Sequence, residues 1–174
     1  MASIAHVAVG MAAGRWAGER RGASSAFVGM LFLSMLGLLP DLDVISFRYG
    51  IAYGDAYGHR GALHSLAVAL VVGVALGAVV PLGRLAMTAR MIVCCAVLAS
   101  HGLLDTLTDG GLGVALLWPV SNHRFFAPIR PIPVAPIGLG LLTRRGATVL
   151  VTELEFCLPL FAYAFFARRS SRTS

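Results

Sequence analysis

The chain has 174 residues, of which 57% are hydrophobic and 13% are charged. Soluble domains carry about 25% charged residues and disordered chains are mostly polar, so this composition excludes a disordered protein and argues against a soluble one. All 14 basic residues are arginine and the net charge is +6. Because the arginines flank apolar segments, they indicate anchoring at lipid headgroups and not nucleic-acid binding. We therefore expect a small integral membrane protein with a single domain over residues 1–174.

Apolar stretches follow one another along the chain. A membrane-spanning helix needs about 20 mostly apolar residues. Residues 61–82, 85–107 and 147–167 come close to that length, and residues 22–39 are slightly short but almost wholly apolar. Residues 3–13 form either a short or tilted span or a half-inserted helix. The sequence thus predicts an all-α integral membrane protein, built as a bundle of four to five transmembrane helices.

Two long connections separate these stretches. Residues 40–60 are polar and contain three aspartates and a histidine. Residues 109–146 contain five of the eight prolines, a density that prevents a continuous helix. The neighbouring Trp118, Phe125 and Phe126 are typical of a membrane interface. We expect a proline-rich interfacial loop that lies along the headgroup layer.

The distribution of arginines between the short loops predicts the orientation in the membrane. If the turn at residues 15–21 is cytoplasmic and the next four segments all span, the cytoplasmic side holds eight arginines: Arg15, Arg20, Arg21, Arg84, Arg90, Arg168, Arg169 and Arg172. The opposite side holds six: Arg48, Arg60, Arg124, Arg130, Arg144 and Arg145. This small excess predicts that both long connections lie outside the cytoplasm.

Ionisable side chains gather near the ends of the predicted spans. An antiparallel bundle brings these ends to one membrane face, where the first segment adds a histidine if it also crosses. Ionisable groups at membrane depth are costly and are functional by default. The candidates are His6, Asp41, Asp43, His59, Arg60, His64, His101 and Asp105.

The types of these residues indicate a metal site. His101 and Asp105 are four residues apart and therefore share one helix face, where imidazole and carboxylate both suit zinc. The alternative is that Asp105 only orients a neutral His101. We expect His64, His101 and Asp105 to share one ion, with at least one of Asp41 and Asp43 as a further ligand. His59 and His6 are additional candidate ligands.

Two arginines are candidates for binding a phosphate group. The guanidinium groups of Arg60 and Arg124 match phosphate oxygens and would stabilise charge on them, although headgroup anchoring is the simpler alternative. Whichever carboxylate of Asp41 and Asp43 does not bind the metal would serve as general base.

Several short motifs together resemble a known family. They are His6, Leu-Pro-Asp-Leu-Asp at 39–43, His-Arg-Gly-Ala-Leu-His-Ser at 59–65, Ser-His-Gly-Leu-Leu-Asp at 100–105 and Leu-Trp-Pro-Val-Ser-Asn-His-Arg-Phe-Phe at 117–126. They cover most of the chain and are similar to the bacterial membrane-bound metal-dependent hydrolases of the YdjM type, described as LexA-regulated inner-membrane proteins. The resemblance implies a multi-pass protein of the bacterial inner membrane with hydrolase activity.

The order of these residues also resembles the zinc-dependent phospholipase C and single-strand nuclease superfamily, which is helical and cleaves phosphoesters. That resemblance implies ligands at His6, Asp41 or Asp43, His59 or His64, His101 and Asp105. The later His and His-x-x-x-Asp of the superfamily are missing after Asp105. The resemblance therefore implies one or two zinc ions and not three.

These observations predict a membrane-bound metal-dependent hydrolase that cleaves a phosphoester in a lipid or lipid-linked substrate at the periplasmic face. The alternative is a non-enzymatic membrane protein, either a metal-ion carrier or a structural partner. A carrier should place its polar groups near the bilayer midplane, whereas here they gather at one end of the spans.

Overall fold

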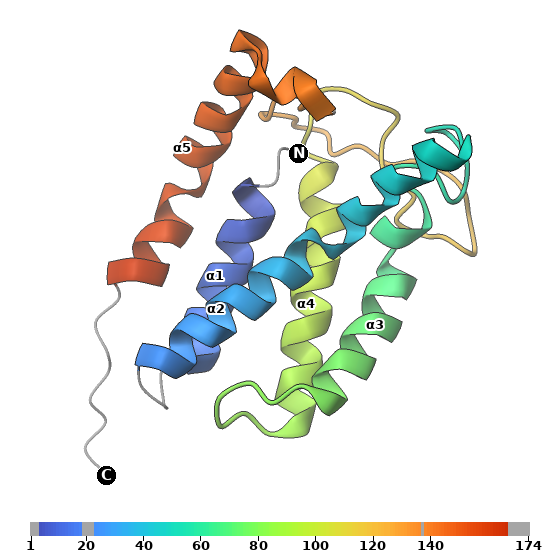
Figure 1. Ribbon diagram of the computed structural model, residues 1–174. Coiled ribbons are helices and arrows are strands. Elements are labelled where there is room, and N and C mark those ends of the chain that lie inside the picture. The colour runs from blue at the N-terminus through green and yellow to red at the C-terminus, as the bar shows by residue number, and fades with distance from the viewer. Residues whose placement is uncertain (1–3, 19–22, 137, 167–174) are drawn as a thin grey trace.

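The computed structural model describes residues 4–18, 23–136 and 138–166. In this part of the chain, five α-helices run alternately up and down (Figure 1). They are α1 (Ile4–Gly18), α2 (Ala23–Leu38), α3 (Leu66–Val79), α4 (Met87–Asp105) and α5 (Arg144–Phe166). Three 3₁₀ helices join them, η1 (Leu39–Tyr49), η2 (Ala62–His64) and η3 (Gly138–Leu142). Within the described residues, extended pairing is limited to two isolated bridges, Thr108 with Ile132 and Val114 with Phe125.

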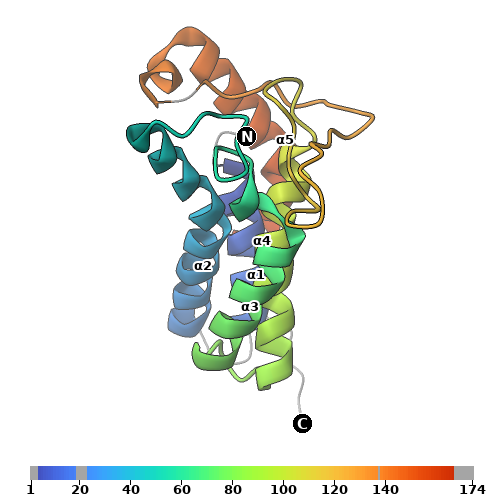
Figure 2. The ribbon, with the colours of Figure 1, turned by 90° about the vertical axis from the view of Figure 1, so that its right-hand side faces the viewer.

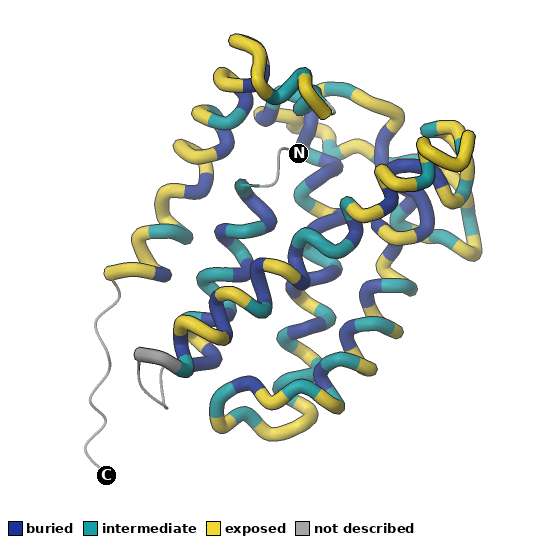
Figure 3. Tube along the Cα trace, in the orientation of Figure 1, coloured by how far each residue is buried: buried dark blue, intermediate teal, exposed yellow. Residues whose placement is uncertain are grey.

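The helices have the distribution of side chains expected in a bilayer. Large apolar side chains point outwards, as with Phe27 and Met35 of α2, each 66% exposed. Figure 3 shows the exposed residues on the outer faces of the helices and the buried ones where helices face each other. Three helices, Ser25–Tyr49, Met87–Asp105 and Arg144–Phe166, are long and apolar enough to cross a membrane. This confirms the predicted all-α membrane fold.

One predicted span is shorter than expected. The apolar stretch 61–82 forms a helix only over Leu66–Val79, which has 14 residues. The chain before it turns through η2, and the Ser65 hydroxyl accepts a hydrogen bond from the backbone N–H of Val68, so the helix begins there. The polar residues that precede Ser65 are thereby kept out of the helix.

The polar connection at 40–60 also differs from expectation. Pro40 does not end the helical structure. Instead, η1 continues in the direction of α2 as far as Tyr49. Proline is tolerated in the first turn of a helix, where its missing N–H is not needed. Gly50 ends η1 with a left-handed φ of 73°. Asp41 and Asp43 are therefore held on a helix and not on a loop.

Glycines allow the helices to pack closely in pairs. Gly10, Gly14 and Gly18 of α1 face the backbone of α2, and a Cβ on Gly14 would lie 2.3 Å from that backbone. A Cβ on Gly73 of α3 would lie 2.6 Å from the Cα of Cys95 in α4. Small residues are the usual contact between helices in membranes, because they let backbones approach. Both pairs contribute residues to the polar end of the bundle.

As predicted, the proline-rich connection is not a continuous helix: its described residues form no α-helix before α5 begins at Arg144, and it folds over one end of the bundle (Figure 2). Val114 and Ile132 are fully buried there. The backbone N–H groups of Asp109 and Ile132 donate to the carbonyls of Ile132 and Leu107 at 2.9 and 3.3 Å. This covering segment closes the end where the candidate residues meet.

Candidate metal centre

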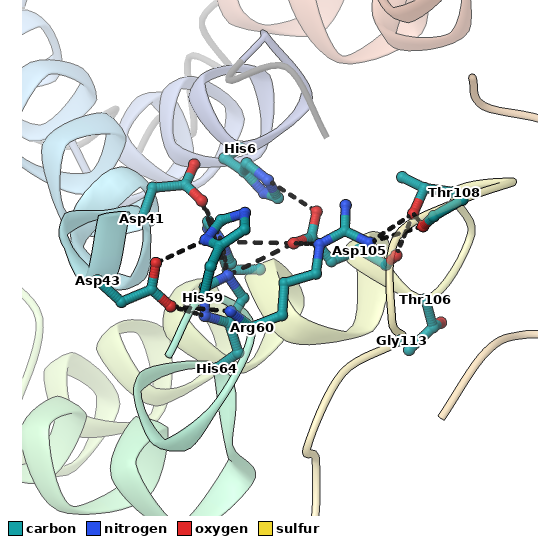
Figure 4. A network of polar contacts seen from close by, with 12 residues as sticks. His6, Asp41, Asp43, His59, Arg60, His64, Asp105, Thr106, Thr108 and Gly113 are labelled. Carbon is teal, nitrogen blue, oxygen red and sulfur yellow. Dashed lines mark hydrogen bonds and ion pairs between the residues drawn. The ribbon is translucent and has the colours of Figure 1, made fainter. Parts of the chain in front are cut away.

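The candidate residues predicted from the ends of the spans lie together at one end of the bundle (Figure 4). α1 contributes one residue from its first turns, η1 contributes two, the segment up to η2 contributes three and the last turns of α4 contribute two. In chain order they are His6, Asp41, Asp43, His59, Arg60, His64, His101 and Asp105.

Four side chains in this group place donor atoms around one point. The Nε2 atoms of His64 and His101 are 2.9 Å apart, and Oδ2 of Asp105 lies 3.4 and 4.0 Å from them. Oδ1 of Asp41 lies 3.7 and 3.4 Å from the same two nitrogens. Zinc bonds of about 2.0 Å in tetrahedral geometry require ligand atoms about 3.3 Å apart. The separations therefore fit a single small ion.

The backbone of α2 sets the orientation of His101. Its Nδ1 lies 2.7 Å from the carbonyl oxygen of Gly37, and a carbonyl can only accept, so Nδ1 carries the hydrogen. The Nε2 lone pair consequently faces the other three donors, as in many metal-bound histidines. A Cβ on Gly37 would lie 2.8 Å from the carbonyl oxygen of His6, so glycine is needed for this close approach.

His64 is held among three carboxylates. Burial alone would lower its pKa, but Asp105, Asp41 and Asp43 raise the pKa of His64 to about 10. Because Nε2 of His101 can only accept here, the 2.9 Å contact places a hydrogen on Nε2 of His64, which donates it to His101. Loss of this single proton would leave two imidazole lone pairs pointing at the same position.

Asp43 bridges two histidines beside this position. Its Oδ1 is hydrogen-bonded to Nδ1 of His59 at 2.6 Å, and its Oδ2 lies 3.0 Å from Nδ1 of His64. The backbone N–H of Arg60 also donates to Oδ2, at 3.0 Å. Asp43, His59 and His64 are close enough to share an ion, but the short contact to His59 is a hydrogen bond. The geometry thus favours Asp41 over Asp43, and His64 over His59, around the four-donor position.

His6 lies against the opposite side of the cluster. Its ring stacks on that of His101 with centroids 3.7 Å apart. Its Nε2 is 3.5 Å from Oδ1 of Asp105, whose other oxygen faces His64. Neither ring nitrogen of this buried histidine is hydrogen-bonded to a described residue. An imidazole buried without hydrogen bonds is costly, which makes His6 a further candidate ligand.

Arg60 is buried against the same aspartate. Its Nε lies 3.2 Å from Oδ2 of Asp105, and its Nη1 donates to Oγ1 of Thr108 at 2.9 Å and to the carbonyl of Gly110 at 3.2 Å. The side chain is only 2% exposed. The sequence did not point to Thr108 or to the Gly37 carbonyl, since a lone threonine and a backbone carbonyl carry no recognisable motif.

Arg124 lies at the edge of the cluster, on the proline-rich connection. The hydrogen bonds of its two terminal nitrogens go to backbone carbonyls at distances of 3.1 to 3.4 Å. The acceptors are Tyr53, Asp55, His59, Arg60 and Gly113. Its predicted contact with substrate stays a prediction.

Comparison with known proteins identifies the family. Residues 1–171 match the family described as YdjM inner membrane protein. The chain is 46% identical over 125 residues to the inner membrane protein YbcI of Escherichia coli (strain K12), a match that covers 69% of this chain and 70% of that protein. No solved structure matches. Neither description names a reaction or a cofactor, and the resemblance to the phospholipase C superfamily stays a prediction. On the first two matches, the chain belongs to the YdjM family of inner membrane proteins.

Proposed function

We propose that the protein is a membrane-bound metal-dependent hydrolase whose ion is held by His64, His101 and Asp105. One observation carries the proposal. His64 on η2 and His101 and Asp105 on α4 each bring one donor atom to the same place, and these atoms are 2.9 to 4.0 Å apart, near the ligand spacing of a tetrahedral zinc ion. Three protein ligands with an open fourth side are typical of catalytic zinc sites. A bound divalent ion would supply Lewis acidity that activates water and polarises a phosphoryl oxygen.

His6 and Asp105 are the candidate ligands of a second ion. The two carboxylate oxygens of Asp105 face different partners, since Oδ2 lies near His64 and Oδ1 lies near His6. We propose that His6 and Asp105 would hold this second ion, which would add Lewis acidity beside the first. This arrangement would use the Nε2 atom of His6, which is buried 3.5 Å from Oδ1 of Asp105.

Asp41 is suited to the role of general base. Its side chain is 23% exposed, whereas those of His64 and Asp105 are fully buried. Its carboxylate oxygen therefore lies on the open side, where it can take a proton from the attacking water. Asp43 is occupied with His59 and His64. Arg60 remains the candidate for balancing charge near the phosphoryl oxygens.

The surroundings of Asp41 favour a lipid or lipid-linked substrate. Leu42 and Ile45, on the same 3₁₀ helix, are 58% and 50% exposed. Tyr57 and Trp118 form an edge-to-face pair with centroids 5.8 Å apart, and such residues are common at membrane interfaces. A lipid could therefore keep its chains in the bilayer while a phosphoester at its headgroup reaches Asp41. The arginine distribution favours a periplasmic site.

Metal analysis of the full chain purified in detergent tests the proposal. We expect one or two zinc ions per chain, loss of zinc in His101→Ala, one ion fewer in His6→Ala, and no change in His123→Ala, whose histidine is exposed. Vesicles of phosphatidylglycerol and phosphatidylethanolamine should release phosphate or phosphorylated headgroup, and chelation should stop the release. Parent protein without zinc would overturn the proposal. Zinc binding without phosphoester cleavage would favour a metal carrier instead.

A further inference from the structure

Arg124 connects three segments that are distant in the sequence. Its Nη1 donates to the carbonyls of His59, Arg60 and Gly113 at 3.2, 3.4 and 3.3 Å. Its Nη2 donates to those of Tyr53 and Asp55, both at 3.1 Å. The guanidinium carbon also lies 5.9 Å from the centre of the Tyr53 ring. One side chain thus ties residues 53–60 to the proline-rich connection.

The tied segment is under local strain where it enters the site. Arg60 has a φ of 62°, in the left-handed region that non-glycine residues rarely adopt. Its N–H donates to Asp43, and its carbonyl accepts from the N–H of Ala115 at 3.0 Å as well as from Arg124. A strained conformation persists only when several contacts hold it. Arg124 supplies one of these contacts at Arg60 and another at the adjacent His59.

We propose that Arg124 is a positioning residue that holds residues 53–60 in place. In this position His59 contacts Asp43, and the Arg60 guanidinium contacts the metal ligand Asp105. The guanidinium suits this role because it is planar and has five N–H donors, whereas lysine offers three donors at one point. Arg124 acts on the site through these two residues and not through a bond to substrate. The role as a metal-site support rests on the proposed function.

The zinc affinity of Arg124 variants distinguishes a positioning role from a contact with substrate or an anchor to lipid. In detergent-purified full-length protein, competition with a chelator should give a zinc Kd about 10- to 100-fold weaker for Arg124→Ala, the range typical for residues that support metal ligands. Arg124→Lys should lose nearly as much, because it keeps the charge but cannot reach five carbonyls. Added guanidinium at millimolar concentration should restore affinity in Arg124→Ala and not in Arg124→Lys. Arg130→Ala is the matched control, since Arg130 is exposed on the same connection.

Other outcomes would overturn the positioning role. A substrate contact predicts unchanged zinc affinity in Arg124→Lys with a fall in kcat/KM alone. A lipid anchor predicts that Arg124→Lys behaves like the parent. If Arg124→Ala does not fold, the lysine variant decides between these outcomes.

Backbone amide hydrogen exchange tests the positioning role of Arg124 independently of metal binding. The amides of residues 58–62 should exchange at least 10-fold faster in Arg124→Lys than in Arg130→Ala. Parent protein that binds no zinc would overturn the proposed function and leave this exchange result to decide the positioning role. Unchanged exchange would overturn the positioning role, whether or not zinc binds.

Discussion

Asp105 divides its two carboxylate oxygens between different neighbours. Oδ2 faces His64 and the guanidinium of Arg60, and Oδ1 faces His6. The residue is fully buried, so each contact is made in a region of low dielectric constant, where losing a partner is costly. Asp41 belongs to the same cluster but reaches the surface. The two aspartates should therefore respond differently to the same substitution.

Asparagine at these two positions should separate the metal ligand from the general base. Asp105→Asn removes a negative ligand and should abolish zinc binding. Asp41→Asn should keep at least one zinc ion and lose turnover by about 10²- to 10⁴-fold, the usual contribution of general acid–base catalysis. Zinc stoichiometry and phosphate release, measured on the same preparations, check both expectations. Equal loss of zinc in the two variants would show that Asp41 is only a ligand.

At the scale of helices, close pairing positions the site. α3 follows directly from η2 with His64, and α4 ends with His101 and Asp105. The two helices touch at Gly73 of α3, where an added Cβ would lie 2.6 Å from the backbone of α4. A larger side chain there must push the helices apart, because backbone atoms cannot move aside cheaply. The distance between His64 and His101 depends on this contact.

Gly73→Leu should therefore weaken both the fold and the metal site. We expect a loss of about 1–3 kcal/mol in stability from overpacking, seen as a lower Tm in detergent, together with weaker zinc binding. Ala75→Leu adds a side chain of the same size to an exposed position of the same helix and should change neither quantity. A Gly73→Leu variant with the parent's Tm and zinc affinity would contradict the proposed importance of the contact.

At the scale of the whole molecule, the two ends of the bundle carry different ionisable residues. The site end contains the clustered carboxylates and histidines, with Arg60 buried beside Asp105 and Arg124 bonded to backbone carbonyls. The other end contains the turn between α3 and α4 with Arg84. Arg60 and Arg124 on the site side are thus engaged within the protein. The charge bias continues to favour a cytoplasmic position for the opposite end.

Cysteine labelling should report this orientation. Tyr57 is 65% exposed at the site end, and Ala86 is exposed at the other end. In a background without Cys94, Cys95 and Cys157, Tyr57→Cys should react with an impermeant maleimide once the outer membrane is permeabilised. Ala86→Cys should react only after the inner membrane is broken. The reverse pattern would place the site on the cytoplasmic side.

Much of the fold follows from the sequence because its physical causes are local. The shortage of charged residues and the length of the apolar stretches require a helical membrane protein, and the spacing of His101 and Asp105 places both on one helix face. The positions of ionisable residues at the ends of spans also predicted the group that the structure brings together. By contrast, the sequence could not predict that η1 would continue past Pro40, since proline both ends helices and begins them.

The tertiary structure alone decided which of two neighbouring residues lies at the four-donor position. Asp41 and Asp43 are two residues apart, and His59 and His64 flank one turn, so their local patterns are equivalent. A rotation of about 120° per residue along the 3₁₀ helix η1 points Asp41 and Asp43 in different directions. Only the packing of η1, η2 and α4 determines which of these neighbours meets His101. The contacts of Arg124 likewise join residues far apart in the chain. Its role depends on long-range packing, which a local sequence pattern does not encode.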